Sequence, residues 1–174
     1  NSLSEIISRA ANRIYIPITV GGGIRSLDDV QNMLRSGADK VAINTAAIAR
    51  PALIAEVARR FGSQCMVLSV EAKRTGPGHW EAYTDNGRGH TGLDVVDWIA
   101  QAVELGAGEI LLTAMDQDAT RKGLDIELLR AVNARVNVPV ITSGGFGEPA
   151  DLLRASEAGA SGVAIADALH WGRM

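Results

Sequence analysis

The sequence has a single cysteine, Cys65, and only three histidines, and this excludes two kinds of site. One cysteine can form no internal disulfide and no thiolate cluster for zinc. The three histidines are dispersed along the chain and make no metal constellation. We therefore expect neither a disulfide nor a metal site. This cysteine usage is typical of the reducing cytoplasm, where we expect the protein to reside.

The sequence also lacks long apolar runs and a strong excess of one charge. No uninterrupted apolar stretch approaches the roughly 18 residues that a membrane-spanning helix needs, so we expect no membrane partner. The formal net charge is -3, with Lys and Arg scattered, which excludes the basic field of a nucleic-acid-binding protein. Aromatic residues are 4% of the chain, but 47% of residues are hydrophobic, enough for one core. The expected ligand is a small molecule.

Six short β-rich runs alternate with amphipathic helical patterns along the chain. The runs are apolar almost continuously, which is typical of strands covered on both faces in a parallel sheet. Between them, hydrophobic residues recur every three or four positions, as on one face of a helix. Ser26 and Pro51 are signals for helix starts, and Gly106 for a helix end. The predicted strands are residues 15–20, 40–45, 64–71, 109–116, 138–143 and 162–166.

The chain contains an internal repeat. A shift of 122 positions, from Pro17 to Pro139, superposes residues 16–46 on residues 138–168 without a gap. The shift carries the first two strands onto the last two, so the period is four βα units, which is half of an eight-stranded barrel. We predict an α/β fold, a single domain over residues 1–174 that is an incomplete TIM-type (βα)8 barrel with six parallel strands.

Two glycine-rich segments each follow a predicted strand and precede a predicted helix. They contain Gly22 and Gly23 in the first copy of the repeat, and Gly144 and Gly145 in the second. Backbone N–H groups at such turns converge on an anion at the positive end of a helix. We interpret both as phosphate cradles, and two copies at barrel symmetry indicate a ligand with a phosphate at each end. The alternative is that the glycines only make tight turns.

A second loop lies near each cradle, at the end of the next strand. Asn44 and Thr45 follow the strand after the first cradle, and Ala166 and Asp167 follow the strand after the second. A barrel phosphate site commonly lies between two such consecutive loops. The sequence therefore predicts that each pair of loops binds one phosphate.

Candidate catalytic carboxylates lie at the ends of the third and fourth predicted strands, where barrel enzymes build their active sites. Glu71 ends the third strand, and Asp118 and Thr120 follow the fourth. A carboxylate there acts as a general acid or base once its pKa is tuned. The alternative for Asp118 is ordinary loop solvation. Residues 75–92 are interpreted as a long loop, either a lid over the site or an exposed variable loop.

A set of motifs runs along the chain at residues 17–24, 37–41, 43–46, 61–64, 72–74, 106–113 and 143–145. Together they resemble the cyclase subunit of imidazole glycerol phosphate synthase, over essentially the whole chain. The resemblance implies an enzyme of histidine biosynthesis, a carbon–nitrogen lyase that acts as a cyclase. Its substrates are ammonia and an open-chain bis-phosphate, phosphoribulosyl-formimino aminoimidazole carboxamide ribonucleotide. Its products are imidazole glycerol phosphate and aminoimidazole carboxamide ribotide.

The resemblance also implies partners and residue roles. A separate glutaminase subunit supplies ammonia, and no cofactor or metal takes part. Glu71 stands where the family has its second catalytic carboxylate, usually Asp, and Asp118 matches an assisting carboxylate near the second phosphate. Lys40 and Glu109 match charged residues around the ammonia entrance. The residues implied to hold the two phosphates are Gly22, Gly23, Asn44, Thr45, Thr120, Gly144, Gly145, Ala166 and Asp167.

The sequence departs from the family pattern in several places. We expect the chain to lack the family's first two strands, one of which carries the other catalytic Asp, and its last helix. Asp167 replaces a usual Ser, and Ala119 a usual Gly. We therefore expect the chain alone to be inactive. A barrel without two strands exposes unpaired edges, so we also expect a homo-oligomer, most simply a dimer.

Two alternative functions follow from the same residues. The isomerase one step earlier in histidine synthesis shares the half-barrel repeat and a related bis-phosphate, but residues 72–74 and 108–112 favour the cyclase. The second alternative is a non-catalytic barrel fragment that binds phosphate and associates with itself. Phosphate affinity without ammonia-dependent turnover would distinguish this fragment from an enzyme.

Overall fold

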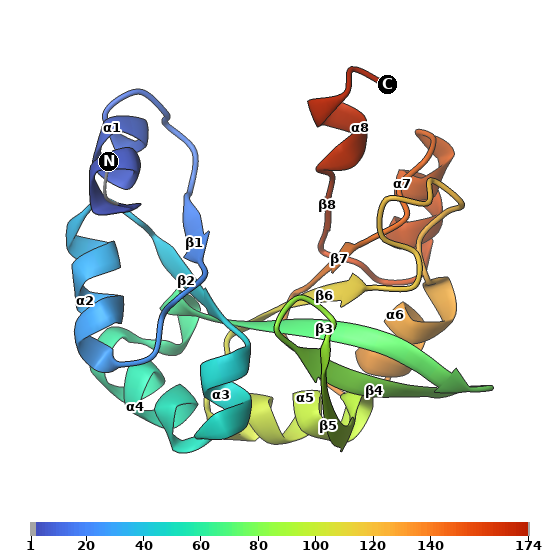
Figure 1. Ribbon diagram of the computed structural model, residues 1–174, viewed down its shortest axis with the longest axis horizontal. Coiled ribbons are helices and arrows are strands. Elements are labelled where there is room, and N and C mark those ends of the chain that lie inside the picture. Colours follow the sequence, from blue (N-terminus) through green and yellow to red (C-terminus); the bar gives the residue numbers. More distant parts are fainter. Residues whose placement is uncertain (1–2, 174) are drawn as a thin grey trace.

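A computed structural model describes residues 3–173, so residues 1–2 and 174 of the predicted domain lie outside the described residues. Six parallel strands form a curled sheet in the order β1-β2-β3-β6-β7-β8, and this confirms the predicted α/β class with a parallel, barrel-like sheet (Figure 1). The strands are β1 (Thr19–Gly21), β2 (Lys40–Ile43), β3 (Met66–Gly76), β6 (Glu109–Ala114), β7 (Val140–Ser143) and β8 (Gly162–Ala164).

Helices cover the outer face of the curled sheet (Figure 1). They pack on it because each carries one apolar face, and α4 for example buries Leu53, Ile54 and Val57. Two short helices, α3 and α8, follow β2 and β8 directly and are not predicted from the sequence. The helices are α1 (Leu3–Ala11), α2 (Leu27–Arg35), α3 (Thr45–Ala49), α4 (Ala52–Phe61), α5 (Val95–Leu105), α6 (Ile126–Asn133), α7 (Ala150–Glu157) and α8 (Asp167–His170), with a 3-10 turn at Ser63–Cys65.

Local signals set the helix ends. Ser26 caps α2 in a capping box with Asp29, in which each side chain accepts from the backbone N–H of the other residue. Gly106 ends α5 in the left-handed conformation at φ 114°, which L side chains rarely adopt. Pro51 stands at the N-cap of α4, where its missing N–H costs no helical hydrogen bond. All three predicted signals are confirmed.

The main hydrophobic core lies between the sheet and its helices. Leu68 and Ile110 of the central strands are fully buried against this layer. Close-packed aliphatic side chains of this kind each contribute on the order of 1.5–3 kcal/mol to folding. The core is therefore centred on β3 and β6, and the outer strands β1 and β8 are less covered.

The prediction of a long loop over residues 75–92 is wrong. Strand β3 runs on to Gly76, and an antiparallel hairpin follows, made of β4 (His79–Thr84) and β5 (Gly89–Asp94). The hairpin forms because alternate residues of β4 are apolar, and Trp80 and Ala82 are buried. Trp80 also donates to the Asp125 carboxylate at 3.1 Å, which ties the hairpin to the start of α6. This hairpin is therefore held in place against the rest of the molecule.

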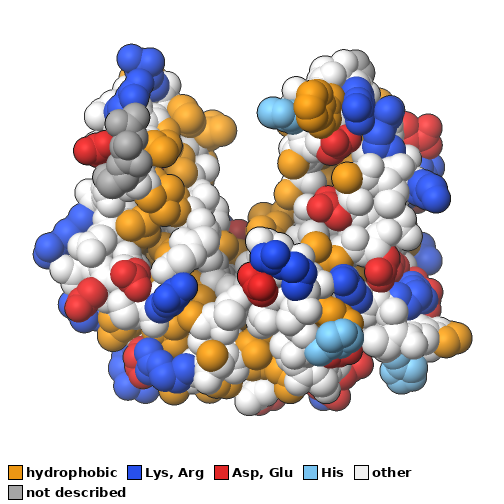
Figure 2. All heavy atoms as spheres, in the orientation of Figure 1, with side chains coloured by type: hydrophobic (Ala, Val, Ile, Leu, Met, Phe, Trp, Pro, Cys, Tyr) orange, Lys and Arg blue, Asp and Glu red, His pale blue; other side chains and the backbone are white. Residues whose placement is uncertain are grey.

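The sheet does not close on itself within the described part of the chain. β1 pairs only with β2, and β8 pairs only with β7. The two edges lie on separate arms that face each other across a gap (Figure 1), and the space-filling view shows the molecule hollowed between them (Figure 2). Each edge strand therefore presents unpaired backbone groups along one side.

Candidate functional site

One cavity of about 950 Å³ lies at the carboxyl ends of the first parallel strands. Chain segments that are far apart in the sequence meet there because parallel strands end at the same edge of a sheet. Five of the predicted site residues are among those that line it, namely Gly22, Gly23, Asn44, Thr45 and Glu71. The structure therefore brings the first predicted cradle and the predicted catalytic carboxylate together.

The first cradle, Gly21 to Ile24, leaves room for an anion. Gly22 and Gly23 have φ of 97° and 72°, and a Cβ added to either would meet nothing within 4 Å. Within the described part of the chain, the N–H groups of Gly23 and Ile24 donate no hydrogen bond. The segment leads into the N-terminus of α2, where the helix dipole favours negative charge. These free donors suit a phosphate.

Asn44 and Thr45 form the second loop of this cavity. Asn44 caps α3, and its side-chain amide donates to the Tyr83 carbonyl at 3.0 Å, which joins the end of β2 to the β4–β5 hairpin. The Asn44 Oδ1 atom is buried and accepts no hydrogen bond in the described residues. Thr45 is exposed at the first position of α3. Its hydroxyl and the first N–H groups of the helix are further donors at this end of the cavity.

Glu71 extends from β3 toward the hairpin turn. Its Oε2 accepts from the Gly87 N–H at 2.8 Å. Its other carboxylate oxygen has no hydrogen-bond partner among the described residues. One oxygen is therefore fixed by the backbone while the other is open to a reacting group, which is an arrangement suited to proton transfer.

The second cradle is built differently. Asp118, Gly144, Gly145, Ala166 and Asp167 all line one small pocket of about 30 Å³. A Cβ on Gly144 would lie 2.5 Å from the Ala114 carbonyl oxygen, and one on Gly145 would lie 2.1 Å from the Gly123 carbonyl oxygen. These two glycines therefore permit close backbone packing, whatever they bind. The interpretation as tight structural turns fits the second cradle better than the first.

Three further predicted residues stand apart from these pockets. Thr120 does not line either pocket, and its hydroxyl donates to the Gln117 carbonyl at 2.7 Å within its own loop. Lys40 and Glu109 begin β2 and β6, so they lie at the opposite end of the sheet from the cradles. They form an ion pair with an N–O distance of 2.5 Å across the intervening strand β3.

Some residues that line the cavity are not among the predicted site residues. Arg25 lines it from the first loop, Arg50 from the C-terminal end of α3, and Asp85 and Asn86 from the hairpin turn. Asp85 and Asn86 both have positive φ, 54° and 55°. The hairpin pair could be found from the Asp-Asn-Gly turn signal between two short alternating runs. An arginine after a glycine-rich turn gives no such signal.

The hairpin wall contributes a neutral phenol beside the cavity. Burial raises the pKa of Tyr83, and the nearby carboxylates of Glu81 and Asp116 raise it further. Its hydroxyl therefore stays protonated at neutral pH and bonds with the His90 ring at 2.8 Å.

The described residues contain neither a metal-binding cluster nor a membrane-spanning helix. No group of three or more His, Cys, Asp and Glu side chains there is placed to hold a metal ion. None of the described helices has both the length and the apolar character needed to cross a membrane.

This chain matches a protein family and is similar to several known proteins. A family model described as histidine biosynthesis protein matches residues 1–174. Imidazole glycerol phosphate synthase subunit HisF of Legionella pneumophila is 63% identical over 148 residues, which are 85% of this chain and 70% of that protein. The subunit HisF of Streptomyces griseus is 55% identical over 170 residues, 98% of this chain and 68% of that protein. The counterpart of Gluconacetobacter diazotrophicus is 49% identical over 174 residues, 100% of this chain and 67% of that protein.

Proposed function

The chain belongs to the histidine biosynthesis protein family, and from this premise we propose that it is a cyclase subunit of imidazole glycerol phosphate synthase. Its substrate is the open-chain phosphoribulosyl-formimino aminoimidazole carboxamide ribonucleotide, which reacts with ammonia. The products are imidazole glycerol phosphate and aminoimidazole carboxamide ribotide. The reaction class is that of a carbon–nitrogen lyase.

The observation that carries this proposal is the layout of the carboxyl ends of the strands. A glycine-rich loop with free N–H groups stands on one side of Glu71 in the sheet order, and a second glycine-rich loop stands on the other side. A substrate with a phosphate at each end would span the two loops and place its reacting centre near the middle strands. In this arrangement Glu71 lies between the two phosphates of the substrate.

We assign the chemistry to a few residues. Glu71 moves protons as general acid or base during ring closure, and Asp118, in the second pocket, assists near the distal phosphate. The loops at Gly23 and Thr45 hold one phosphate, and those at Gly145 and Ala166 hold the other. The side chain of Asp167 pairs with Arg173 at 3.4 Å, so only its backbone N–H serves the phosphate.

The opposite end of the sheet takes the second substrate. Lys40 and Glu109 stand at the amino ends of β2 and β6, where a glutaminase subunit would dock and deliver ammonia. We infer that ammonia enters the sheet beside this ion pair. The proposed partner at this face is therefore a protein, and the partner at the other face is the bis-phosphate.

A second candidate function is supported by the open sheet. The unpaired edges β1 and β8 favour a chain that binds phosphate and associates with itself without turnover. Both candidates share the phosphate cradles, so binding alone does not distinguish them. Turnover does.

The test is an assay of ammonia-dependent cyclisation of the bis-phosphate, in which the formation of imidazole glycerol phosphate is measured. In a chain completed with the family's first two strands, the cyclase proposal expects turnover that falls by about 100-fold or more in Glu71→Gln, because positioned acid–base groups typically supply that factor. Calorimetric binding of the bis-phosphate should be nearly unchanged in this variant. Glu104→Gln, on the outer helix α5, is the matched control and should retain activity. Binding without turnover in the completed chain would contradict the cyclase proposal and support the second candidate.

A further inference from the structure

We propose that the turn of the β4–β5 hairpin positions the Glu71 carboxylate, and that Lys73 is a positioning residue that acts through Gly87. This inference rests on the proposed function of Glu71 and extends it to residues that have no assigned role.

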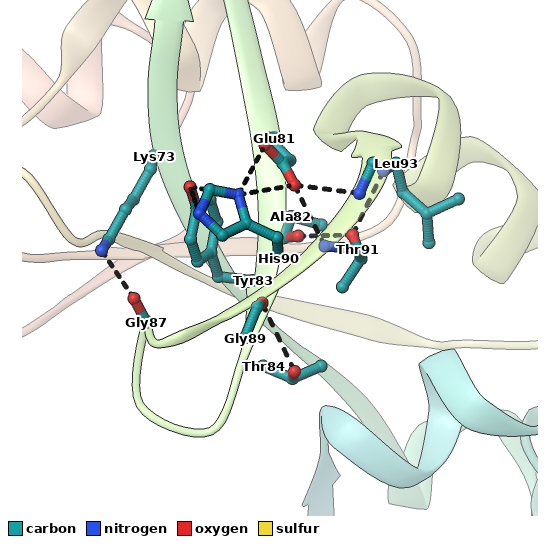
Figure 3. A network of polar contacts seen from close by, with 11 residues as sticks. Lys73, Glu81, Ala82, Tyr83, Thr84, Gly87, Gly89, His90, Thr91 and Leu93 are labelled. Atoms are coloured by element: carbon teal, nitrogen blue, oxygen red, sulfur yellow. Dashed lines mark hydrogen bonds and ion pairs between the residues drawn. The ribbon is translucent and has the colours of Figure 1, made fainter.

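Gly87 is held by two side chains of the same strand. Its N–H donates to Glu71 Oε2 at 2.8 Å, and its carbonyl accepts from Lys73 Nζ at 2.6 Å (Figure 3 shows the lysine contact). Glu71 and Lys73 are two residues apart on β3, so they project from the same face of the strand. The glycine residue is therefore fixed between the acid–base group and a charged donor.

The space around Gly87 leaves it little freedom to move. The residue is buried, with φ of 73°, and an added Cβ would lie 2.9 Å from Met115 Cε and 3.3 Å from Lys73 Cε. The preceding residues Asp85 and Asn86 also have positive φ and line the cavity. A turn that is both conformationally unusual and tightly packed suits a positioning role at a functional site.

Lys73 has no other evident purpose. Within the described residues it makes no ion pair, and it does not line the cavity, so it is not placed to bind a phosphate there. Its ammonium instead lies 4.6 Å from the centre of the Tyr83 ring, a cation–π contact. The Lys73 ammonium is half-buried and has only a carbonyl and a ring as partners. This placement is explained if the ammonium holds the Gly87 carbonyl in position.

A polar network keeps the rest of the hairpin rigid (Figure 3). The Glu81 carboxylate accepts from the N–H groups of Thr91 and Gly92 at 3.0 and 2.9 Å, and these bonds lower its pKa, which keeps it ionised. Tyr83 bonds with His90, and its carbonyl accepts from Asn44. The hairpin thus links the phosphate loop at the end of β2 to the Glu71 carboxylate.

The first test measures hydrogen exchange of the Gly87 amide by NMR on the full chain. Lys73→Met should raise the exchange rate by about tenfold or more, because a charge-assisted hydrogen bond that restrains this peptide is lost. Glu71→Ala should raise it as well, since the acceptor of the amide is removed. Lys73→Arg retains a donor and should stay near wild type. Arg59→Met, which removes an exposed charge from α4, is the control and should change nothing. An unchanged Gly87 rate in Lys73→Met would overturn the proposal.

The second test asks whether Lys73 acts through Glu71. In ammonia-dependent cyclisation, Lys73→Met should lower kcat by about tenfold or more with KM almost unchanged, and Lys73→Arg should recover most of kcat. In a Glu71→Gln background, Lys73→Met should cause no further loss of kcat. A full additional loss in that background, or a loss that appears in KM, would contradict a positioning role. If the chain completed with the family's first two strands shows no cyclisation, the proposed function fails, and the exchange measurement still decides the role of Lys73.

Discussion

Asp29 and Asp151 make the same hydrogen bonds at positions 122 residues apart. Asp29 accepts from the N–H groups of Arg25 and Ser26, both at 3.0 Å. Asp151 accepts from the N–H groups of Gly147 and Glu148 at 2.9 and 3.1 Å. Each carboxylate therefore fixes the turn between a glycine-rich cradle and its helix, and orients the donors that precede it.

The two aspartates differ in burial, and this predicts unequal effects on stability. The Asp151 side chain is 1% exposed and pairs with Arg154 at 2.6 Å. Asp151→Asn should lower the free energy of unfolding by about 1–3 kcal/mol, the usual range for lost bonds to a buried charged group. Asp29→Asn, at a more exposed site, should lower the free energy of unfolding by less. Urea unfolding of both variants tests this, and equal losses would contradict it.

The same aspartate predicts an acid-dependent loss of stability. Desolvation acts to raise the pKa of Asp151, but the bonds from Gly147, Arg154 and Glu148 outweigh it and lower the pKa below the ordinary value of 3.8. Since the folded pKa lies below the unfolded one, the stabilisation is complete above about pH 4 and is lost as the pH falls through the folded pKa. The stability difference between wild type and Asp151→Asn, measured from pH 7 to pH 2, should therefore shrink at the acid end. A constant difference would exclude this linkage.

The two cradles should respond differently to substitution of glycine. Gly23→Ala places its Cβ in open space, so the protein should fold with only the strain of a positive φ, about 1–2 kcal/mol. Gly145→Ala would drive its Cβ to 2.1 Å from the Gly123 carbonyl oxygen and should disrupt the loop. Calorimetric titration with the bis-phosphate should show weaker binding for a folded Gly23→Ala. Thermal unfolding should show the larger loss for Gly145→Ala.

The strands were predictable because their physics is local. Continuous apolar runs bounded by polar residues mark buried parallel strands, and the carboxyl ends of such strands meet at one edge. This is why Gly23, Asn44 and Glu71 could be expected to lie together and do line one cavity. The predicted limits differ from the observed ones where a run begins or ends with residues outside the ladder, as in β1, which starts only at Thr19.

The hairpin and its contacts were not predictable to the same degree. Residues 75–92 contain glycine, proline and scattered charges, so the alternation of β4 is short and easily read as a loop. The bond between Glu71 and Gly87 depends on how this hairpin folds back over β3, and no spacing in the sequence encodes that return. The crowding at Gly145 likewise arises from a distant carbonyl, that of Gly123.

Arg25 and Arg50 should contribute to anion binding in the large cavity. Both line it beside the free N–H groups of the first cradle, although Arg50 also pairs with Glu56 at 2.5 Å. Arg25→Gln and Arg50→Gln should each weaken calorimetric binding of inorganic phosphate by about threefold to tenfold, with a larger effect for Arg25, whose guanidinium forms no salt bridge within residues 3–173. Arg35→Gln, at the far end of α2, serves as the control. Unchanged affinity in both cavity variants would mean that the backbone N–H groups alone bind the phosphate.

The ion pair between Lys40 and Glu109 should stabilise the sheet without influencing the cradles. The Glu109 side chain is 12% exposed, so Lys40→Met leaves a poorly solvated carboxylate and should lower the free energy of unfolding by about 1–3 kcal/mol. The double variant Lys40→Met with Glu109→Gln should lose less than the sum of the single losses. Phosphate binding should not change, because the pair is at the opposite end of the strands. Additive losses in urea unfolding would contradict the coupling.

The open edges of the sheet predict self-association. Among the described strands, β1 and β8 each lack a partner on one side, and large apolar side chains near them are exposed, with Ile16 at 71% and Trp171 at 61%. Unpaired parallel edges with apolar surroundings favour pairing with another copy. Light scattering at micromolar concentration should therefore give a mass above the 18.3 kDa of one chain. Ile16→Lys and Trp171→Lys should shift the mass toward the monomer, whereas Leu153→Lys, on the outer helix α7, should not. A monomer with sharp two-state unfolding at every concentration would mean that the edges are satisfied within one chain.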